Sequence, residues 1–198
     1  MTTDLKALRR TLKTRRRLLS PQEQHACAQQ AVQHLLGERV FRAARNIAIY
    51  LPVRGEISPL ALRHPANPRQ RFYLPVLSPC RHQGLLFLRW HAGTRFRTNR
   101  YRIDEPKLQS HHLLPARQLD LVITPLLGFD AIGKRLGMGG GYYDRSFAFK
   151  LRQHSHPRPL LLGFAYAFQQ VETLAHRPWD IPLDGVVTER GLKWFNHD

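Results

Sequence analysis

The sequence has 198 residues, of which 42% are apolar and 10% aromatic, and this composition favours a folded domain over a disordered chain. Its formal charge of +17 points to an anionic partner: nucleic acid, an acidic membrane face or a small anionic ligand. Cys27 and Cys80 lie too far apart to indicate a cysteine zinc site or a disulfide framework, and no apolar run approaches the roughly 18 residues of a membrane span.

Two helices are predicted at the start of the chain. Leucines recur at helical spacing over residues 4–19, where seven Lys and Arg residues fall between positions 6 and 17. Ser20, Pro21 and Glu23 then form a helix start, with a hydroxyl N-cap and a Glu three residues later. The second helix is expected to run to about Leu36, with Gly37 ending it.

Strands and helices alternate over the rest of the chain. Ser58 and Pro59 open a short helix, residues 91–118 are predicted as loops with short helices, and a further helix is expected over 142–153. Strands are predicted at residues 46–51, 71–77, 85–90, 119–127, 159–166 and 185–189, the last of the chain. This alternation predicts a single three-layer α/β/α domain over residues 1–198, Rossmann-like, with a mostly parallel central sheet and a basic N-terminal helix.

The beginning of the sequence lacks the continuous apolar core of a secretory signal. The two cysteines are best explained as free thiols in a reducing compartment. We therefore expect a cytoplasmic protein, although an Arg-rich amphipathic beginning is also typical of organelle transit peptides.

A glycine-rich segment follows the predicted strand at 119–127. Gly137, Gly139, Gly140 and Gly141 fall within five residues, and Lys134, Arg135 and Arg145 flank them. Because glycines lack Cβ atoms, backbone N–H groups in such a segment can converge on an anion. A tightly turning loop is the alternative, but the added cations and the adjoining Tyr-Tyr-Asp favour a phosphate-binding loop.

Residues 128–134 match the first seven positions of the P-loop pattern GxxxxGK[ST]. The eighth position is Arg135, which lacks the hydroxyl that holds Mg²⁺ in a P-loop. The segment that should already be helical is also rich in glycine. The sequence therefore argues against a P-loop NTPase.

Several carboxylates and aromatic residues are candidates for a site. Asp144 and Asp184 are equally well explained as magnesium ligands or as surface carboxylates, whereas spacing favours a surface or capping role for Asp180. Glu56 follows a buried strand, where parallel sheets place their ligands, but its position alone favours a solvated loop carboxylate. Tyr101 can stack on a flat ring or simply pack.

The basic N-terminal helix has three interpretations. It is a solvated face, a contact surface for RNA, or a source of charge that neutralises a triphosphate. Lys6 and Arg10 lie one helical turn apart, which is compatible with each of these roles.

Together these segments resemble the 5-formyltetrahydrofolate cyclo-ligase family. The resemblance is carried by Leu8-Arg9 in a basic helix followed by Leu-Ser-Pro, and by residues 50–57, 120–130, 133–145 and 179–189. It implies the ATP- and Mg²⁺-dependent conversion of 5-formyltetrahydrofolate to 5,10-methenyltetrahydrofolate, with ADP and phosphate as the other products. The formyl oxygen would be phosphorylated before the ring closes.

The resemblance also implies roles for individual residues. Leu51, Glu56 and Tyr101 would contact the folate, Asp144 and Asp184 would lie near Mg²⁺, and a basic pair on the first helix would meet ATP. Leu5 stands where the family usually has Lys, which leaves Lys6, Arg9 and Arg10 as alternatives. The expected ATP-binding residues on the loop are Lys134, Arg135, Leu136, Gly137, Met138, Gly139, Gly140, Gly141, Tyr142 and Tyr143, with Arg135 and Arg145 as the catalytic cations.

We expect a monomer that acts on a reduced folate, with or without a polyglutamate tail, without a membrane partner and without nucleic acid. Two other functions remain open at this point. A basic RNA-binding accessory protein would explain the charge but gives no reason for the segment 137–144. A kinase of another small acid would keep the ATP loop and lose the folate.

Overall fold

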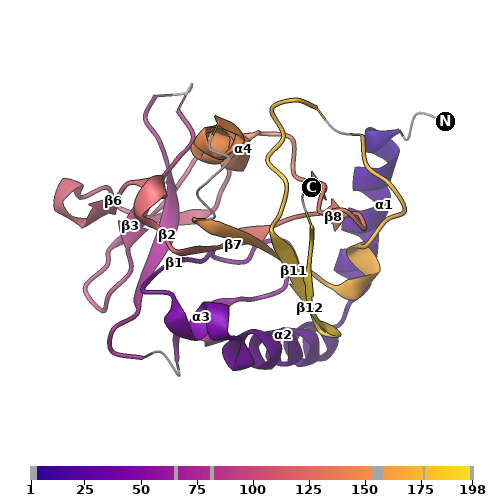
Figure 1. The fold of residues 1–198 in the computed structure, drawn as a ribbon, viewed down its shortest axis with the longest axis horizontal. Coiled ribbons are helices and arrows are strands. Elements are labelled where there is room, and N and C mark those ends of the chain that lie inside the picture. Colours follow the sequence, from indigo (N-terminus) through magenta and orange to yellow (C-terminus); the bar gives the residue numbers. More distant parts are fainter. Residues whose placement is uncertain (1–3, 65–66, 81–82, 153–157, 176, 197–198) are drawn as a thin grey trace.

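The computed structural model describes the chain except residues 1–3, 65–66, 81–82, 153–157, 176 and 197–198. Within these described ranges its centre is an eight-stranded sheet in the order β12-β11-β10-β7-β1-β2-β3-β6 (Figure 1). The strands are β1 (Asn46–Ala48), β2 (Arg71–Leu77), β3 (Leu85–Arg89), β6 (Leu113–Leu114), β7 (Leu121–Pro125), β10 (Leu160–Phe164), β11 (Gly185–Thr188) and β12 (Gly191–Trp194).

The middle of this sheet is parallel, as the sequence predicts. β1 pairs in parallel with β2 and β7, β7 with β10, and β10 with β11. The antiparallel pairs lie toward the edges, where β12 joins β11 and where β3 joins both β2 and β6. The mostly parallel α/β fold is therefore confirmed.

Helices cover both faces of the sheet. α2 (Pro21–Gly37) and α3 (Arg39–Ala43) lie on one face, and α4 (Tyr142–Phe147) lies on the other (Figure 1). Successive strand residues supply the two apolar cores in turn: Ile47 packs on the side of α2, and Ala48 packs on the side of α4. This alternation follows from the two-residue period of a strand.

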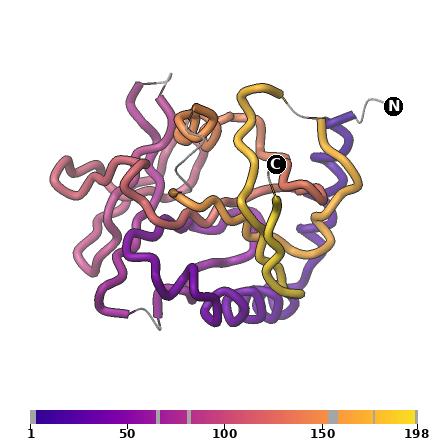
Figure 2. Tube along the Cα trace, in the orientation of Figure 1, coloured from indigo at the N-terminus to yellow at the C-terminus, as the bar shows by residue number. Residues whose placement is uncertain are grey.

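α1 (Leu5–Leu18) lies at one end of the sheet rather than on either face (Figure 2). Its Leu12 packs with Leu127, Leu136 and Leu174 in a small separate cluster. The following turn forms the predicted capping box, in which Ser20 Oγ accepts from the backbone N of Glu23 and the Glu23 carboxylate accepts from the backbone N of Ser20. None of the described helices is long and apolar enough to cross a membrane.

Several short elements differ from the predictions. The predicted strands at 46–51 and 119–127 are shorter, α3 was not predicted, and β12 follows the strand expected to be the last. Two hairpins also form: β4 (Phe96–Thr98) with β5 (Asp104–Pro106), inside the predicted loop, and β8 (Gly128–Phe129) with β9 (Arg135–Leu136). Strands of two or three residues are too short to show a period.

The helix predicted over residues 142–153 is also shorter. α4 ends at Phe147 and a 3-10 helix continues it over Ala148–Arg152, while Gln153 lies outside the described residues. Its beginning at Tyr142 agrees with the prediction and places the glycine segment between β9 and α4. That position brings the loop to the carboxyl ends of the parallel strands.

Candidate active site

A cavity of about 920 Å³ opens at the carboxyl ends of the parallel strands. Tyr50 and Leu51, which follow β1, line it together with Leu77 at the end of β2 and Pro125 at the end of β7. This is the edge where open parallel sheets bind their ligands. The volume is in the range of a site for a cofactor-sized molecule.

The glycine-rich loop forms one wall of this cavity. Gly139 has φ of +100° and Gly141, the residue before α4, has φ of +61°, so both need a backbone conformation that side chains disfavour. An added Cβ at Gly137 or Gly139 would meet no atom within 4 Å. The backbone of the loop therefore faces open space that a ligand can fill.

Arginines from three elements surround the loop. Arg9 Nε on α1 donates to the carbonyl of Gly137 at 3.1 Å, and Arg145 of α4 donates to the carbonyl of Gly140 at 2.9 Å. Arg135 of β9, whose side chain is 7% exposed, forms an ion pair with Asp144. The arrangement concentrates positive charge where the backbone is bare, which suits phosphate groups.

The geometry separates the three candidate cations on the first helix. Leu5, Arg9 and Lys13 line the cavity at intervals of four residues, which is one face of α1. Lys6 and Arg10 are not among the residues that line it. Of the three predicted cations, Arg9 alone lines the cavity, and Lys13, which was not predicted, lines it as well.

The acidic residues are placed differently from the prediction. Asp144 lines the cavity, and its Oδ1 accepts from the backbone N of Ile181 at 3.2 Å in addition to its ion pair with Arg135. Asp180, which spacing assigned to the surface, lines the same cavity. Both are carboxylates of the type that binds Mg²⁺ together with substrate phosphates.

Asp184 does not line the cavity, so the structure does not bring it beside Asp144 as the sequence predicts. Its Oδ2 accepts from the backbone N of Leu161 at 2.6 Å and from Lys150 Nζ at 3.1 Å. These partners lie at the beginning of β10 and after α4, so the carboxylate joins elements at the opposite end of the strands. Within the described part of the chain, no group of three or more His, Cys, Asp and Glu residues is arranged to hold a metal ion.

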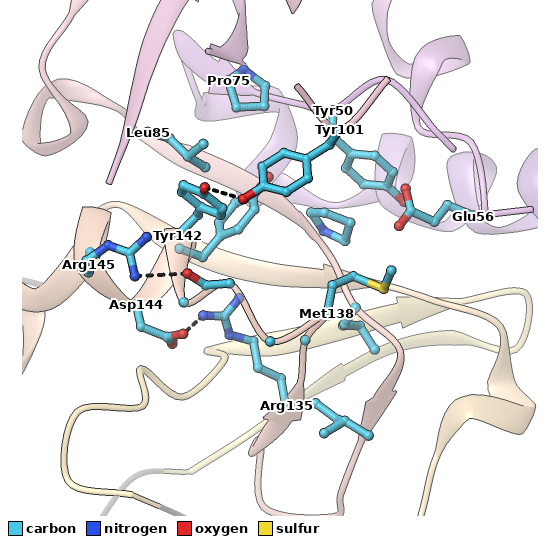
Figure 3. A pocket seen from close by; sticks show the side chains of 18 of the residues that line it. Tyr50, Glu56, Pro75, Leu85, Tyr101, Arg135, Met138, Tyr142, Asp144 and Arg145 are labelled. Atoms are coloured by element: carbon cyan, nitrogen blue, oxygen red, sulfur yellow. Dashed lines mark hydrogen bonds and ion pairs between the residues drawn. The ribbon is translucent and has the colours of Figure 1, made fainter. Parts of the chain in front are cut away.

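The β4–β5 hairpin reaches the glycine loop through its turn. The hydroxyls of Tyr101 and Tyr142 are 2.7 Å apart, and Arg100 donates to the Tyr142 hydroxyl at 2.7 Å. The two rings meet edge to face, with centroids 6.0 Å apart (Figure 3). The segment 91–118, which was predicted as loops with short helices, therefore contributes Tyr101 to the cavity. Its contacts with Tyr142 join the β4–β5 hairpin to the glycine-rich loop.

Glu56 lies at the other end of the cavity, away from Asp144 and Arg145 (Figure 3). Its side chain is 10% exposed, its Oε2 accepts from the backbone N of Val53 at 3.1 Å, and Arg16 lies beside it. Burial raises the pKa of the Glu56 carboxyl, and the positive charge of Arg16 opposes that rise. The buried Glu56 carboxylate lies near aromatic side chains that line the cavity, including Tyr50 and Tyr143.

Comparison with known proteins assigns this architecture to a family. Residues 1–189 match the 5-formyltetrahydrofolate cyclo-ligase family. The chain belongs to this family of ligases.

Relatives and solved structures agree with the assignment. The 5-formyltetrahydrofolate cyclo-ligase of Escherichia coli K12 is 40% identical over 178 residues, covering 89% of this chain and 96% of that protein. The Haemophilus influenzae cyclo-ligase is 42% identical over 166 residues, with coverage of 83% and 87%. The NMR structure of Aquifex aeolicus 5,10-methenyltetrahydrofolate synthetase superposes with a TM-score of 0.80 at 26% identity, covering 98% of this chain and 94% of that one.

Most residues predicted for the site of this cyclo-ligase family member come together. Arg9, Leu51, Glu56, Tyr101 and the whole run of residues 135–145 line one cavity. Lys6, Arg10, Lys134 and Asp184 are not among its lining residues. Lys134 lies in the turn between β8 and β9, where its backbone N donates to Asp130 at 2.9 Å.

Nine polar or aromatic residues that the structure places in the cavity wall were not predicted for the site: Lys13, Tyr50, Arg54, Asn99, Asp104, Glu105, Arg177, Trp179 and Asp180. Lys13 could have been found from its four-residue spacing to Arg9 on the same helix. Arg177, Trp179 and Asp180 lie in an irregular segment before β11, where no period indicates which side chains face inward.

Proposed function

We propose that this chain cyclises 5-formyltetrahydrofolate to 5,10-methenyltetrahydrofolate while converting ATP to ADP and phosphate. One observation carries the proposal: a single cavity joins an arginine-ringed glycine loop to a buried carboxylate at its opposite end. A polyphosphate suits the first end and a flat heterocycle with N–H donors suits the second. The family membership supports the same reaction.

The loop end fits ATP. The bare backbone at Gly137 and Gly139 leaves room for phosphate oxygens, and the N–H groups of Arg9, Arg135 and Arg145 can pair with them. Mg²⁺ bound with the nucleotide would neutralise charge on the phosphates, and Asp144 and Asp180 are the carboxylates that would hold it.

The chemistry needs positioning more than covalent help from the protein. The formyl oxygen attacks the γ-phosphorus and ADP leaves, which converts a poor leaving oxygen into a phosphate ester. N10 then attacks the formyl carbon and loses its proton, and the C–O bond breaks to release phosphate and complete the five-membered ring. Arg135 and Arg145 would stabilise charge on the transferring phosphoryl group, as phosphoryl transfer requires.

The folate would lie across the apolar centre of the cavity toward Glu56. Leu51, Pro75 and Leu85 line this part, and Tyr101 closes it from the hairpin side (Figure 3). A monomeric, single-domain enzyme is part of the proposal. Cys27 and Cys80 are free thiols, which supports a reducing compartment such as the cytoplasm.

The test is a coupled measurement of phosphate release and methenyl absorbance with ATP, Mg²⁺ and 5-formyltetrahydrofolate. We expect the two signals to rise together in equal amounts and to vanish when any component is omitted. 5-Methyltetrahydrofolate is the matched control, since it lacks the formyl oxygen and should support neither signal. ATP consumption that ignores the formyl folate, or that follows another small acid, would contradict the proposal.

A further inference from the structure

Arg16 is a buried charge that the proposed ATP and folate contacts do not use. It lies on α1, its side chain is 2% exposed, and its Nε donates to the carbonyl of Arg54 at 3.1 Å. One terminal nitrogen, NH1, is buried and has no hydrogen-bond partner within the described chain. That nitrogen lies 3.7 Å from Oε1 of Glu56.

The segment carrying Glu56 is fixed around this arginine. Gly55 has φ of +77°, and a Cβ there would lie 3.2 Å from the backbone oxygen of Arg16. Tyr166 donates to the carbonyl of Gly55 at 3.2 Å, and Tyr50 donates to the carbonyl of Ile57 at 2.6 Å. The segment is therefore held from α1, β1 and the end of β10, which leaves Glu56 little freedom to turn away.

The separation of the pair matters for its chemistry. At 3.7 Å the two groups attract each other strongly in a buried setting but form no regular hydrogen bond. The Arg16 charge thus favours the ionised carboxylate without occupying the Oε1 lone pairs. Those lone pairs stay available to a donor that enters the cavity.

The other groups facing Glu56 give less help. Arg54, from the same loop, lowers the pKa of Glu56 less than Arg16 and the backbone N of Val53 do. Burial raises the pKa values of Tyr50, Tyr143 and Tyr166, so these phenols are uncharged near neutral pH. Arg16 is the principal counter-charge.

We propose that Arg16 is a positioning residue that holds Glu56 as a carboxylate, so that Glu56 accepts a hydrogen bond from an N–H group of the bound folate. Arg16 itself does not line the cavity and acts through Glu56. The inference rests on the proposed function, because it takes the folate as the ligand of this end.

The rival explanation is purely structural: Arg16 stabilises the docking of α1 through its hydrogen bond to the carbonyl of Arg54 and does not affect the protonation of Glu56. The two explanations differ in pH dependence. If Arg16 sets the charge of Glu56, its removal shifts the pH at which Glu56 gains its proton. If the role of Arg16 is only structural, its removal lowers the stability of the fold but does not shift the pH at which Glu56 gains its proton.

The experiment measures kcat/KM for 5-formyltetrahydrofolate against pH at saturating ATP, in wild type, Arg16→Gln and Arg16→Lys. We expect the acid limb of Arg16→Gln to move up by roughly one to three pH units, the usual effect of losing an adjacent opposite charge. Arg16→Lys keeps the charge and should stay near the wild-type limb. Arg17→Gln is the matched control, since this exposed neighbour loses the same charge and should leave the limb unmoved.

A second measurement does not depend on activity. Carbon-13 NMR titration of the glutamate carboxyls, with Glu56→Gln to assign the signal, reads the protonation of Glu56 in each variant. An upward shift in Arg16→Gln supports the inference, and an unshifted signal in a folded Arg16→Gln protein overturns it. If the wild type forms no methenyl product while the shift is present, the proposed function fails and the pairing stands.

Instability of the neutral variant is also informative. If Arg16→Gln unfolds at neutral pH because Glu56 is left as a lone buried charge, the double variant Arg16→Gln/Glu56→Gln should fold there. If the double variant stays unfolded, Arg16 is required for structure alone and the inference is overturned.

Discussion

The two ends of the cavity select their ligands by different physical means. The glycine-loop end gathers arginines from α1, β9 and α4 around exposed backbone, so several donors share the same task. At the other end the buried Glu56 carboxylate lies beside its principal counter-charge, Arg16, among phenols and apolar side chains. At the first end charge acts directly on the bound phosphates, whereas at the second end one charge sets the protonation of a single carboxylate.

The largest expected effect concerns Arg135, at the glycine-loop end of the cavity. The side chain of Arg135 is 7% exposed and is paired with Asp144. We expect Arg135→Ala to lower kcat by on the order of 100-fold, the usual effect of removing a donor that stabilises transition-state charge. Steady-state kinetics would measure this, with Arg42→Ala on the exposed side of α3 as the control. Undiminished turnover in a folded Arg135→Ala protein would remove this residue from the catalytic assignment.

A smaller effect would separate the neighbouring cations of α1. Arg9 donates to Gly137, while Arg10 is exposed and faces away from the cavity. Arg9→Ala should raise the KM for ATP about tenfold, in line with the loss of a charged hydrogen bond, and Arg10→Ala should change it less than about twofold. Equal effects from both variants would mean that overall charge, and not the geometry of the loop, attracts the nucleotide.

The contact between the β4–β5 hairpin and the glycine loop should contribute less to substrate binding than Arg9 does. Tyr101→Phe keeps the ring and removes one partner of the hydroxyl contact with Tyr142. We expect the KM values for both substrates to rise about threefold, since a neutral hydrogen bond at an exposed site contributes little. Tyr101→Ala also removes the ring, so its effect should be larger for the folate than for ATP. A larger rise in the KM for ATP than in the KM for the folate would assign Tyr101 to the glycine-loop end of the cavity.

The smallest effect concerns the phenols around Glu56 and shows only in alkali. Burial raises the pKa of Tyr166 from 10.0 to about 12. The folded protein then keeps a proton that the unfolded chain loses, so stability is intact below pH 10 and falls as the pH rises toward 12. Urea unfolding across this range should show the decline, and Tyr166→Phe should make it shallower. An unchanged slope in that variant would assign the decline to other buried groups.

The sequence predicted the features that depend on local pattern. The strand at residues 71–77 and the capping box at Ser20 were correct because they rest on apolar runs and on cap chemistry. The glycine loop could be singled out because its composition is rare outside tight turns and anion sites, and it lines the cavity, while its binding of phosphate stays a prediction. The resemblance placed Glu56 at the folate, and the structure places it in the same cavity as the loop.

What the sequence could not predict depends on tertiary contacts. Asp180 and Asp184 lie four residues apart in an irregular segment, and only the fold shows that the first lines the cavity while the second binds the backbone of Leu161. Arg16 falls in a run of three arginines, and its burial against Glu56 follows from where α1 docks. No local pattern distinguishes one arginine of such a run from its neighbours.

α1 connects the two ends of the cavity in one rigid piece. Arg9 contacts the glycine loop and Arg16 contacts the Glu56 segment. The two arginines are seven positions apart, which is about 10 Å of helix and close to two full turns. The helix therefore fixes both the distance between the two side chains and the face of the helix from which they project. Inserting one residue between them would rotate one relative to the other by about 100°, so that no docking of the helix could satisfy both ends at once.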